Sequence, residues 1–167
     1  MADTHADRRS VLAGILVGWI LTILFVAGAW TVAPVTDDPA RATAIALIAA
    51  CLPLALGIGA AAALRHLSAG IDGAAPPPGS RLDIVLRFVV NTTEQLTLLV
   101  PTCLALWLAD PAFAARLLPI LGLWFAVARL LFLVGYLRAP TLRAAGFAAT
   151  FHTTLAVLGL SIYRLLV

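Results

Sequence analysis

Long hydrophobic runs alternate with short polar or proline-rich segments along the chain. Five of the runs reach or exceed the roughly 20 residues that an α-helix needs to cross a bilayer. They cover residues 11–33, 42–64, 84–109, 117–137 and 144–163. Because lipid offers no hydrogen-bond partners to an open backbone, these runs predict helices. We therefore expect an all-α integral membrane helical bundle with five transmembrane helices.

Composition supports a membrane protein and argues against other classes. Of the 167 residues, 62% are hydrophobic and only 11% are charged, which is unlike a soluble globular domain. The basic residues are scattered at the ends of the runs and form no single basic face, so we expect no nucleic-acid partner. Cys51 and Cys103 both lie inside hydrophobic runs, where buried thiols are common, and we expect no metal site.

The arginines between the runs predict the orientation in the membrane. Positive residues concentrate on the cytoplasmic side of membrane proteins. With the N-terminus in the cytoplasm, this side receives Arg8, Arg9, Arg65, Arg81, Arg138 and Arg143, whereas the other side receives Arg41, Arg116 and Arg164. The bias favours a cytoplasmic N-terminus and a C-terminus on the far side.

The first run predicts a membrane anchor. It is 23 residues long, whereas the apolar core of a cleaved signal peptide has about 7–15. Gly14 and Gly18 are four residues apart and would lie on one side of this helix. Such a pair of small residues would let the first helix pack closely on a neighbour.

Polar residues in the third run share one face of the predicted helix. Arg87, Asn91 and Glu94 are separated by four and three residues, and each is costly in hydrocarbon. Glu94 and Arg129 of the fourth run both lie about 12 to 15 Å below the cytoplasmic starts of their helices. We expect these two residues to interact directly or through one water or ligand. Either they form a structural clamp, or they join Tyr136 in a polar pocket for an anionic ligand.

Two stretches of the sequence resemble the MAPEG family, the membrane-associated proteins in eicosanoid and glutathione metabolism. Residues 87–94 read Arg-Phe-Val-Val-Asn-Thr-Thr-Glu, which is similar to the family motif Arg-x-x-x-Asn-x-x-Glu. Arg129 is followed seven residues later by Tyr136, and a loop with Pro140 and Arg143 comes next, as in family members. The resemblance covers about residues 42–167.

The resemblance implies an architecture and an oligomeric state. Family members have four spanning helices and form homotrimers. Residues 1–41 would then be an N-terminal tail with an additional transmembrane helix, and residues 42–167 a MAPEG-like four-helix membrane domain. A bacterial-type member would reside in the inner membrane.

The resemblance also implies glutathione as the cofactor, bound between subunits near the cytoplasmic side. At the matching positions, the glutathione-binding residues would be Arg87, Asn91, Glu94, Arg129 and Tyr136. Arg143 and Arg129 would be catalytic. Glutathione carries two carboxylates and an ammonium group, so cations with one carboxylate complement it. A nearby guanidinium would favour the reactive thiolate form of its thiol.

Three classes of function are compatible with this sequence. The first is a glutathione-dependent transferase or peroxidase that acts on lipophilic electrophiles within the membrane. The second is a non-catalytic membrane protein that retains the MAPEG fold. The third is a small proton-coupled transporter that uses Glu94, although the chain shows no internal repeat of the kind found in transporters.

Overall fold

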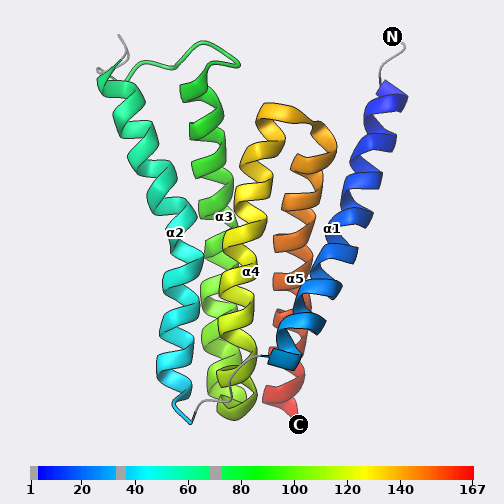
Figure 1. Cartoon of the computed structure of the whole chain (residues 1–167). Helices are drawn as coiled ribbons and strands as arrows, with labels where there is room; N and C mark the ends of the chain where they lie inside the picture. Colours follow the sequence, from blue (N-terminus) through cyan, green and yellow to red (C-terminus); the bar gives the residue numbers. More distant parts are fainter. Residues whose placement is uncertain (1–3, 33–36, 68–72) are drawn as a thin grey trace.

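The computed structural model describes residues 4–32, 37–67 and 73–167, which form an up-and-down bundle. Its five helices are α1 (Thr4–Val32), α2 (Pro39–His66), α3 (Arg81–Ala109), α4 (Pro111–Arg138) and α5 (Pro140–Leu166). The described parts of the two ends of the chain lie at opposite ends of the bundle (Figure 1). The all-α prediction is confirmed. The expected end of the first run, Ala33, lies outside the described residues.

The helices start earlier than the hydrophobic runs because their capping residues lie outside those runs. Pro39, Pro111 and Pro140 occupy the first turns of α2, α4 and α5, where a missing backbone N–H has no cost. The side chains of Asp38 and Asp110 accept hydrogen bonds from backbone N–H groups three residues further on, at 2.9 and 3.0 Å. These aspartates satisfy N–H groups that a helix start would leave unpaired.

Four of the helices are long and apolar enough to cross a membrane: α1, α2, α4 and α5. Helix α3 has 29 residues but does not join them, because charged and polar side chains occupy much of its first half. It packs against α2, α4 and α5 within the bundle (Figure 1). The chain is therefore an integral membrane protein in which α3 is more polar than the four helices that are apolar enough to cross a membrane.

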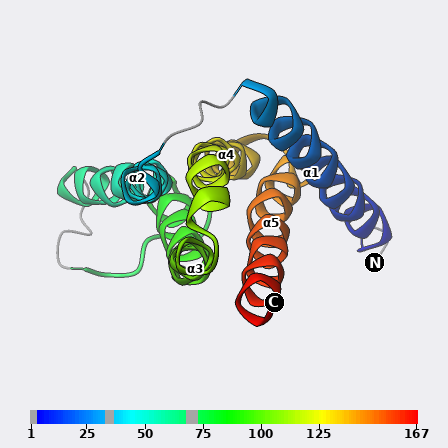
Figure 2. The same ribbon diagram turned by 90° about the horizontal axis from the view of Figure 1, so that it is seen from below.

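Helix α1 lies at the edge of the bundle. It packs mainly on α5 and to a smaller extent on α4, on the side away from α2 and α3 (Figure 2). At Gly18, an added Cβ would lie 2.5 Å from the backbone oxygen of Ala145 in α5. Gly14 makes an equally close approach to the backbone of α5 one turn earlier. The close packing expected from this glycine pair is confirmed, and its partner is α5.

We predict that Gly18→Ala loosens α1 from the bundle. The new methyl group would collide with backbone atoms, and overpacking of this kind costs about 1–3 kcal/mol. The expected result is a lower unfolding temperature of the purified protein in detergent. Gly28→Ala is the matched control, because a Cβ at this exposed position in the same helix meets nothing within 4 Å. Equal unfolding temperatures for the two variants would contradict this role of Gly18.

Candidate functional site

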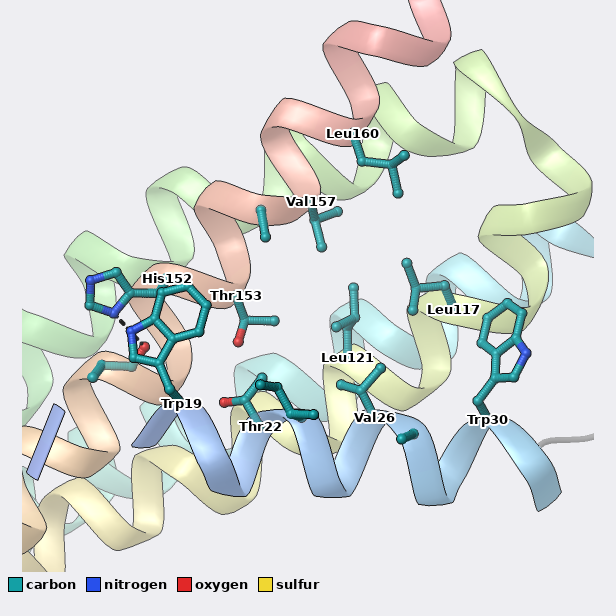
Figure 3. A pocket seen from close by; sticks show the side chains of 14 residues that line it. Trp19, Thr22, Val26, Trp30, Leu117, Leu121, His152, Thr153, Val157 and Leu160 are labelled. Atoms are coloured by element: carbon teal, nitrogen blue, oxygen red, sulfur yellow. Dashed lines mark hydrogen bonds between the residues drawn. The ribbon is translucent and has the colours of Figure 1, made fainter. Parts of the chain in front are cut away.

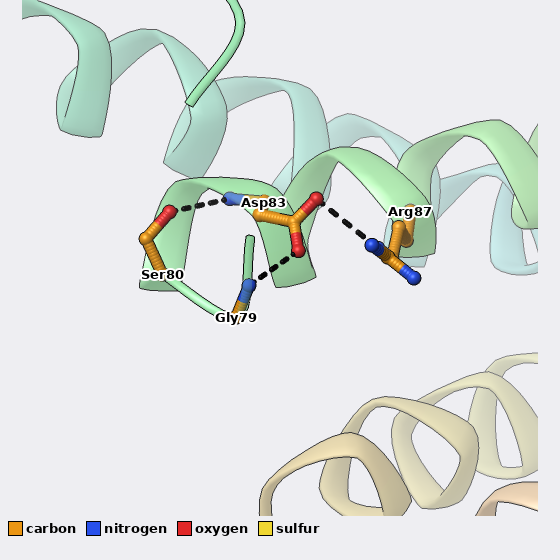
Figure 4. Close-up of polar contacts among 4 residues, drawn as sticks. All are labelled: Gly79, Ser80, Asp83 and Arg87. Atoms are coloured by element: carbon orange, nitrogen blue, oxygen red, sulfur yellow. Dashed lines mark hydrogen bonds and ion pairs between the residues drawn. The ribbon is translucent and has the colours of Figure 1, made fainter. Parts of the chain in front are cut away.

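The first turn of α3 is organised by a carboxylate that the sequence analysis did not single out. The Asp83 side chain accepts hydrogen bonds from the Gly79 N–H at 2.8 Å and from Arg87 Nε at 3.1 Å (Figure 4). Ser80 caps the helix by accepting a hydrogen bond from the Asp83 N–H. Gly79 has a φ of +76°, a conformation that favours glycine.

Asp83 stays ionised and neutralises part of the charge of Arg87. Asp83 precedes the hydrophobic run that starts at residue 84. The Gly79 N–H and then the Arg87 guanidinium lower the pKa of its carboxyl below the ordinary value. The Arg87 side chain remains 58% exposed, so it keeps donor groups that face outward. Arg87 is thus held in place on one side and available to another anion on the other.

Arg129 is fully buried where α3, α4 and α5 meet. Its Nη1 donates to Asn91 Oδ1 at 2.8 Å, and its Nη2 donates to the backbone oxygen of Gly146 at 3.0 Å and to Thr150 Oγ1 at 2.6 Å. The guanidinium also lies 4.5 Å from the ring centroid of Phe132. Neither ion pair among the described residues includes it. A buried cation is therefore stabilised by neutral oxygens and an aromatic face.

The close contact of α4 with α5 explains how Arg129 reaches its acceptors. A Cβ at Gly146 would lie 2.5 Å from the backbone nitrogen of Phe132 and 2.7 Å from the backbone oxygen of Ala128. Only glycine allows α5 to approach α4 this closely. The approach brings the Gly146 carbonyl and the Thr150 hydroxyl to the guanidinium.

Asn91 joins Arg129 to Glu94. Its Oδ1 accepts from Arg129, and its Nδ2 donates to Glu94 Oε2 at 3.2 Å. Because a guanidinium has no acceptor, the amide oxygen must face Arg129, which directs the NH₂ group to the carboxylate. Glu94 itself is exposed on the surface of the chain. The direct contact between Glu94 and Arg129 considered from the sequence is wrong, since a neutral amide lies between the two charges.

Tyr136 and Arg143 form a second group near the loop between α4 and α5. The Arg143 guanidinium lies 5.1 Å from the Tyr136 ring centroid, and this ring meets Phe132 edge-on at 5.2 Å. Beside Tyr136 and Arg143 lies a cavity of about 350 Å³ that is closed on one side by α1.

The structure thus places the expected site residues in two layers at α3 and in the separate group formed by Tyr136 and Arg143. Arg87 and Glu94 lie at the surface of α3 with the half-buried Asn91 beside them, and Arg129 lies behind them in the interior. Asp83, Gly146 and Thr150 hold the two arginines but were not predicted from the sequence. Asp83 carried a local signal, because acidic and basic residues four positions apart face each other on a helix. Gly146 and Thr150 carried none, since their role depends on how α5 packs on α4.

We predict that Asn91 is needed for stability because of its bond to Arg129. Asn91→Leu would leave a buried guanidinium donor without an acceptor, at a cost of about 1.5–3 kcal/mol. Thermal unfolding in detergent should show a clear loss. Thr93→Val is the control, because the exposed Thr93 hydroxyl bonds only to its own helix, at the Val89 carbonyl. If Asn91→Leu unfolds at the same temperature as Thr93→Val, Asn91 does not support Arg129.

One comparison with known proteins identifies a family. The MAPEG family matches residues 10–163, a range that includes most of α1 and the site residues on α3, α4 and α5. No curated protein and no solved structure matched the chain. The division into an N-terminal addition and a domain of residues 42–167 stays a prediction. With most of its length matched by the family, and with a helical membrane bundle as its fold, this chain belongs to the MAPEG family.

Proposed function

We propose that this membrane protein binds glutathione on the outward face of α3, near the end of the bundle that carries Arg87 and Tyr136. The observation that supports this most directly is the row formed by Arg87, Asn91 and Glu94. A cation, an amide and a carboxylate follow one another along α3, and the two charged ends of the row are exposed. Few membrane helices carry such a row unless it binds something.

The charges of these residues suit glutathione. Glu94 is an exposed carboxylate that matches the ammonium group of glutathione, and Arg87 is an exposed cation that matches the carboxylate at the other, glycine end of the molecule. Arg143 is a further exposed cation at the same end of the bundle as Arg87. Seven residues of α-helix separate Arg87 from Glu94, a rise of about 10 Å. An extended tripeptide spans about 10 to 11 Å. One molecule would therefore reach both ends of the row.

We assign Arg129 a positioning role, in place of the catalytic and glutathione-binding roles that the resemblance implies. Its Nη1 and Nη2 donate to protein acceptors and its side chain is fully buried, so it is a poor candidate for direct contact with a ligand. It would act by fixing the orientation of Asn91, which in turn orients Glu94. We place Arg129 among the positioning residues and leave Arg87 and Arg143 as the cations that meet the ligand.

The family supports a reaction in which bound glutathione supplies a thiol for conjugation to lipophilic electrophiles or for reduction of peroxides. Arg143 and Tyr136 are the groups of this chain that would favour the thiolate, by their charge and by hydrogen bonding. Their neighbouring cavity opens between helices, which suits a substrate that arrives from the membrane. Turnover of a generic electrophile or a hydroperoxide would distinguish an enzyme from a glutathione-binding protein without catalysis.

A homotrimer in the bacterial inner membrane, with five spanning helices and a cytoplasmic N-terminus, completes the proposal. The surface of α3 exposes Thr93, Glu94 and Thr97, which are costly groups to place against lipid. A second copy of the chain would cover this face. The glutathione site would then lie between subunits, where water and ligand reach it from the cytoplasmic end.

We predict that Arg87→Ala weakens glutathione binding about tenfold to more than a hundredfold, because the variant loses the charge-assisted hydrogen bond to a carboxylate of the ligand. Isothermal titration calorimetry of the purified protein in detergent measures this. Glu94→Gln should weaken binding as well by removing the partner of the ammonium group. Arg41→Ala is the control, because Arg41 is an exposed arginine at the opposite end of the bundle. Binding that is unaffected in both site variants would place glutathione elsewhere or exclude it.

Asp83→Asn should act in the opposite direction. The amide no longer competes as an anion for Arg87, so glutathione should bind up to about fivefold more tightly, the scale of an exposed ion pair. The same titration measures this, with the parent protein and Arg87→Ala in parallel. In the double variant Asp83→Asn/Arg87→Ala the gain should vanish. A gain that persists without Arg87 would show that Asp83 acts by another route.

A further inference from the structure

A long apolar groove lies between α1, α4 and α5, apart from the residues assigned to glutathione. Its volume is about 600 Å³, within the range of small-molecule sites. Side chains of α1 form one wall and those of α4 and α5 form the other, with Trp19 and Trp30 toward its two ends (Figure 3). Eleven residues of helix separate these tryptophans, which gives the groove a length of roughly 16 Å.

The groove exists because α1 is held on the bundle at separate points. Gly14 and Gly18 fix the first half of α1 against α5. In the second half, Arg116 Nη2 of α4 donates to the backbone oxygen of Trp30 at 2.7 Å. Between these points, small residues such as Ala27 and Ala156 face the gap and do not fill it. The packing of α1 thus leaves room for another molecule.

The lining selects a hydrocarbon. Besides the tryptophans, the side chains with polar atoms in the walls are Thr22, Thr153 and His152. The two hydroxyls donate to carbonyls of their own helices, and His152 Nδ1 is likewise bonded to the Ala148 carbonyl. Thr22 additionally accepts from Trp124 Nε1. A polar ligand such as glutathione would lose its hydration without replacement here, whereas an unbranched acyl chain would lose nothing.

Next to Trp30, at one end of the groove, lies a cation that does not line the groove itself and has no ion-pair partner among the described residues. The Arg116 guanidinium lies 4.2 Å from the Trp30 ring centroid, and its Nε is buried without a hydrogen-bond partner. The nearby carboxylate of Asp110 is paired with Arg164 at 3.0 Å. The surroundings of Arg116 therefore favour an anion.

We propose that this groove binds a single hydrocarbon chain of an anionic amphiphile, with the chain along α1 and the anionic head group at Arg116. A free fatty acid and an anionic phospholipid share this chemistry. The site is independent of glutathione, because none of its lining residues belongs to the row on α3. It assigns a role to α1 as the wall of a lipid site.

Quenching of tryptophan fluorescence tests the proposal, because Trp19 and Trp30 line the groove. The full-length protein in nonionic detergent is titrated with dibromostearic acid, its methyl ester and a dibrominated phosphatidylglycerol. We expect saturable quenching by at least one of the two anionic probes and at least about tenfold weaker binding of the ester. Saturation by the acid alone identifies a fatty-acid site, and saturation by the phospholipid identifies a membrane-lipid site. Quenching that never saturates with any probe overturns the proposal.

Variants assign the signal to the groove. Ala156→Phe should fill it and abolish saturable quenching, and Ala27→Phe fills it from the opposite wall if the first variant does not fold. Ala60→Phe, on the exposed surface of α2, is the control and should bind as the parent does. Arg116→Gln should weaken binding of the acid about tenfold more than binding of the ester, because the lost bond to the Trp30 carbonyl affects both probes alike. Saturable quenching that survives both filling variants places the lipid elsewhere, and an unchanged Arg116→Gln overturns the assignment of the head group.

Discussion

The buried guanidinium of Arg129 constrains the arrangement of three helices at once. A cation removed from water must be surrounded by acceptors, or the protein loses several kcal/mol of stability. Arg129 belongs to α4 and finds its acceptors on α3 and α5, at Asn91, Gly146 and Thr150. A shift of any of these helices along its axis would break one of the bonds. The cation therefore fixes the relative register of α3, α4 and α5.

This constraint extends to the surface of α3. The acceptor that Arg129 requires fixes the orientation of the Asn91 amide, and the other end of the amide then donates to Glu94. Arg87 is held independently, by Asp83 one turn earlier in the same helix. The row of polar groups is thus positioned from two directions. Its deeper part depends on the packing of the bundle, and its first part depends on the local structure at the start of α3.

The two sides of the bundle offer different environments. The exposed face of α3 carries charges and hydroxyls, which calls for water, a polar ligand or another copy of the chain. The groove beside α1 is mainly apolar, and the hydroxyls of Thr22 and Thr153 in its walls donate to carbonyls of their own helices. Glycines govern this second side, because the close approach at Gly14 and Gly18 determines where α1 lies on α5. The polar face of α3 and the apolar groove beside α1 are lined by different residues, so a ligand at one does not displace a ligand at the other.

The sequence alone determined the number and type of the elements and the residues on one face of α3. Both depend on local properties: the length of hydrophobic runs, prolines and aspartates at helix starts, and the helical period that aligns Arg87, Asn91 and Glu94. The partner of each charged group was decided by the tertiary structure. Glu94 and Arg129 were expected to interact directly or through one water or ligand, whereas Asn91 lies between them. Periodicity does not specify such a contact, because it depends on how the side chains of two helices pack. The roles of Gly146 and Thr150 follow from the close approach of α5 to α4, and the groove follows from the position of α1, so neither could be read from the order of the residues.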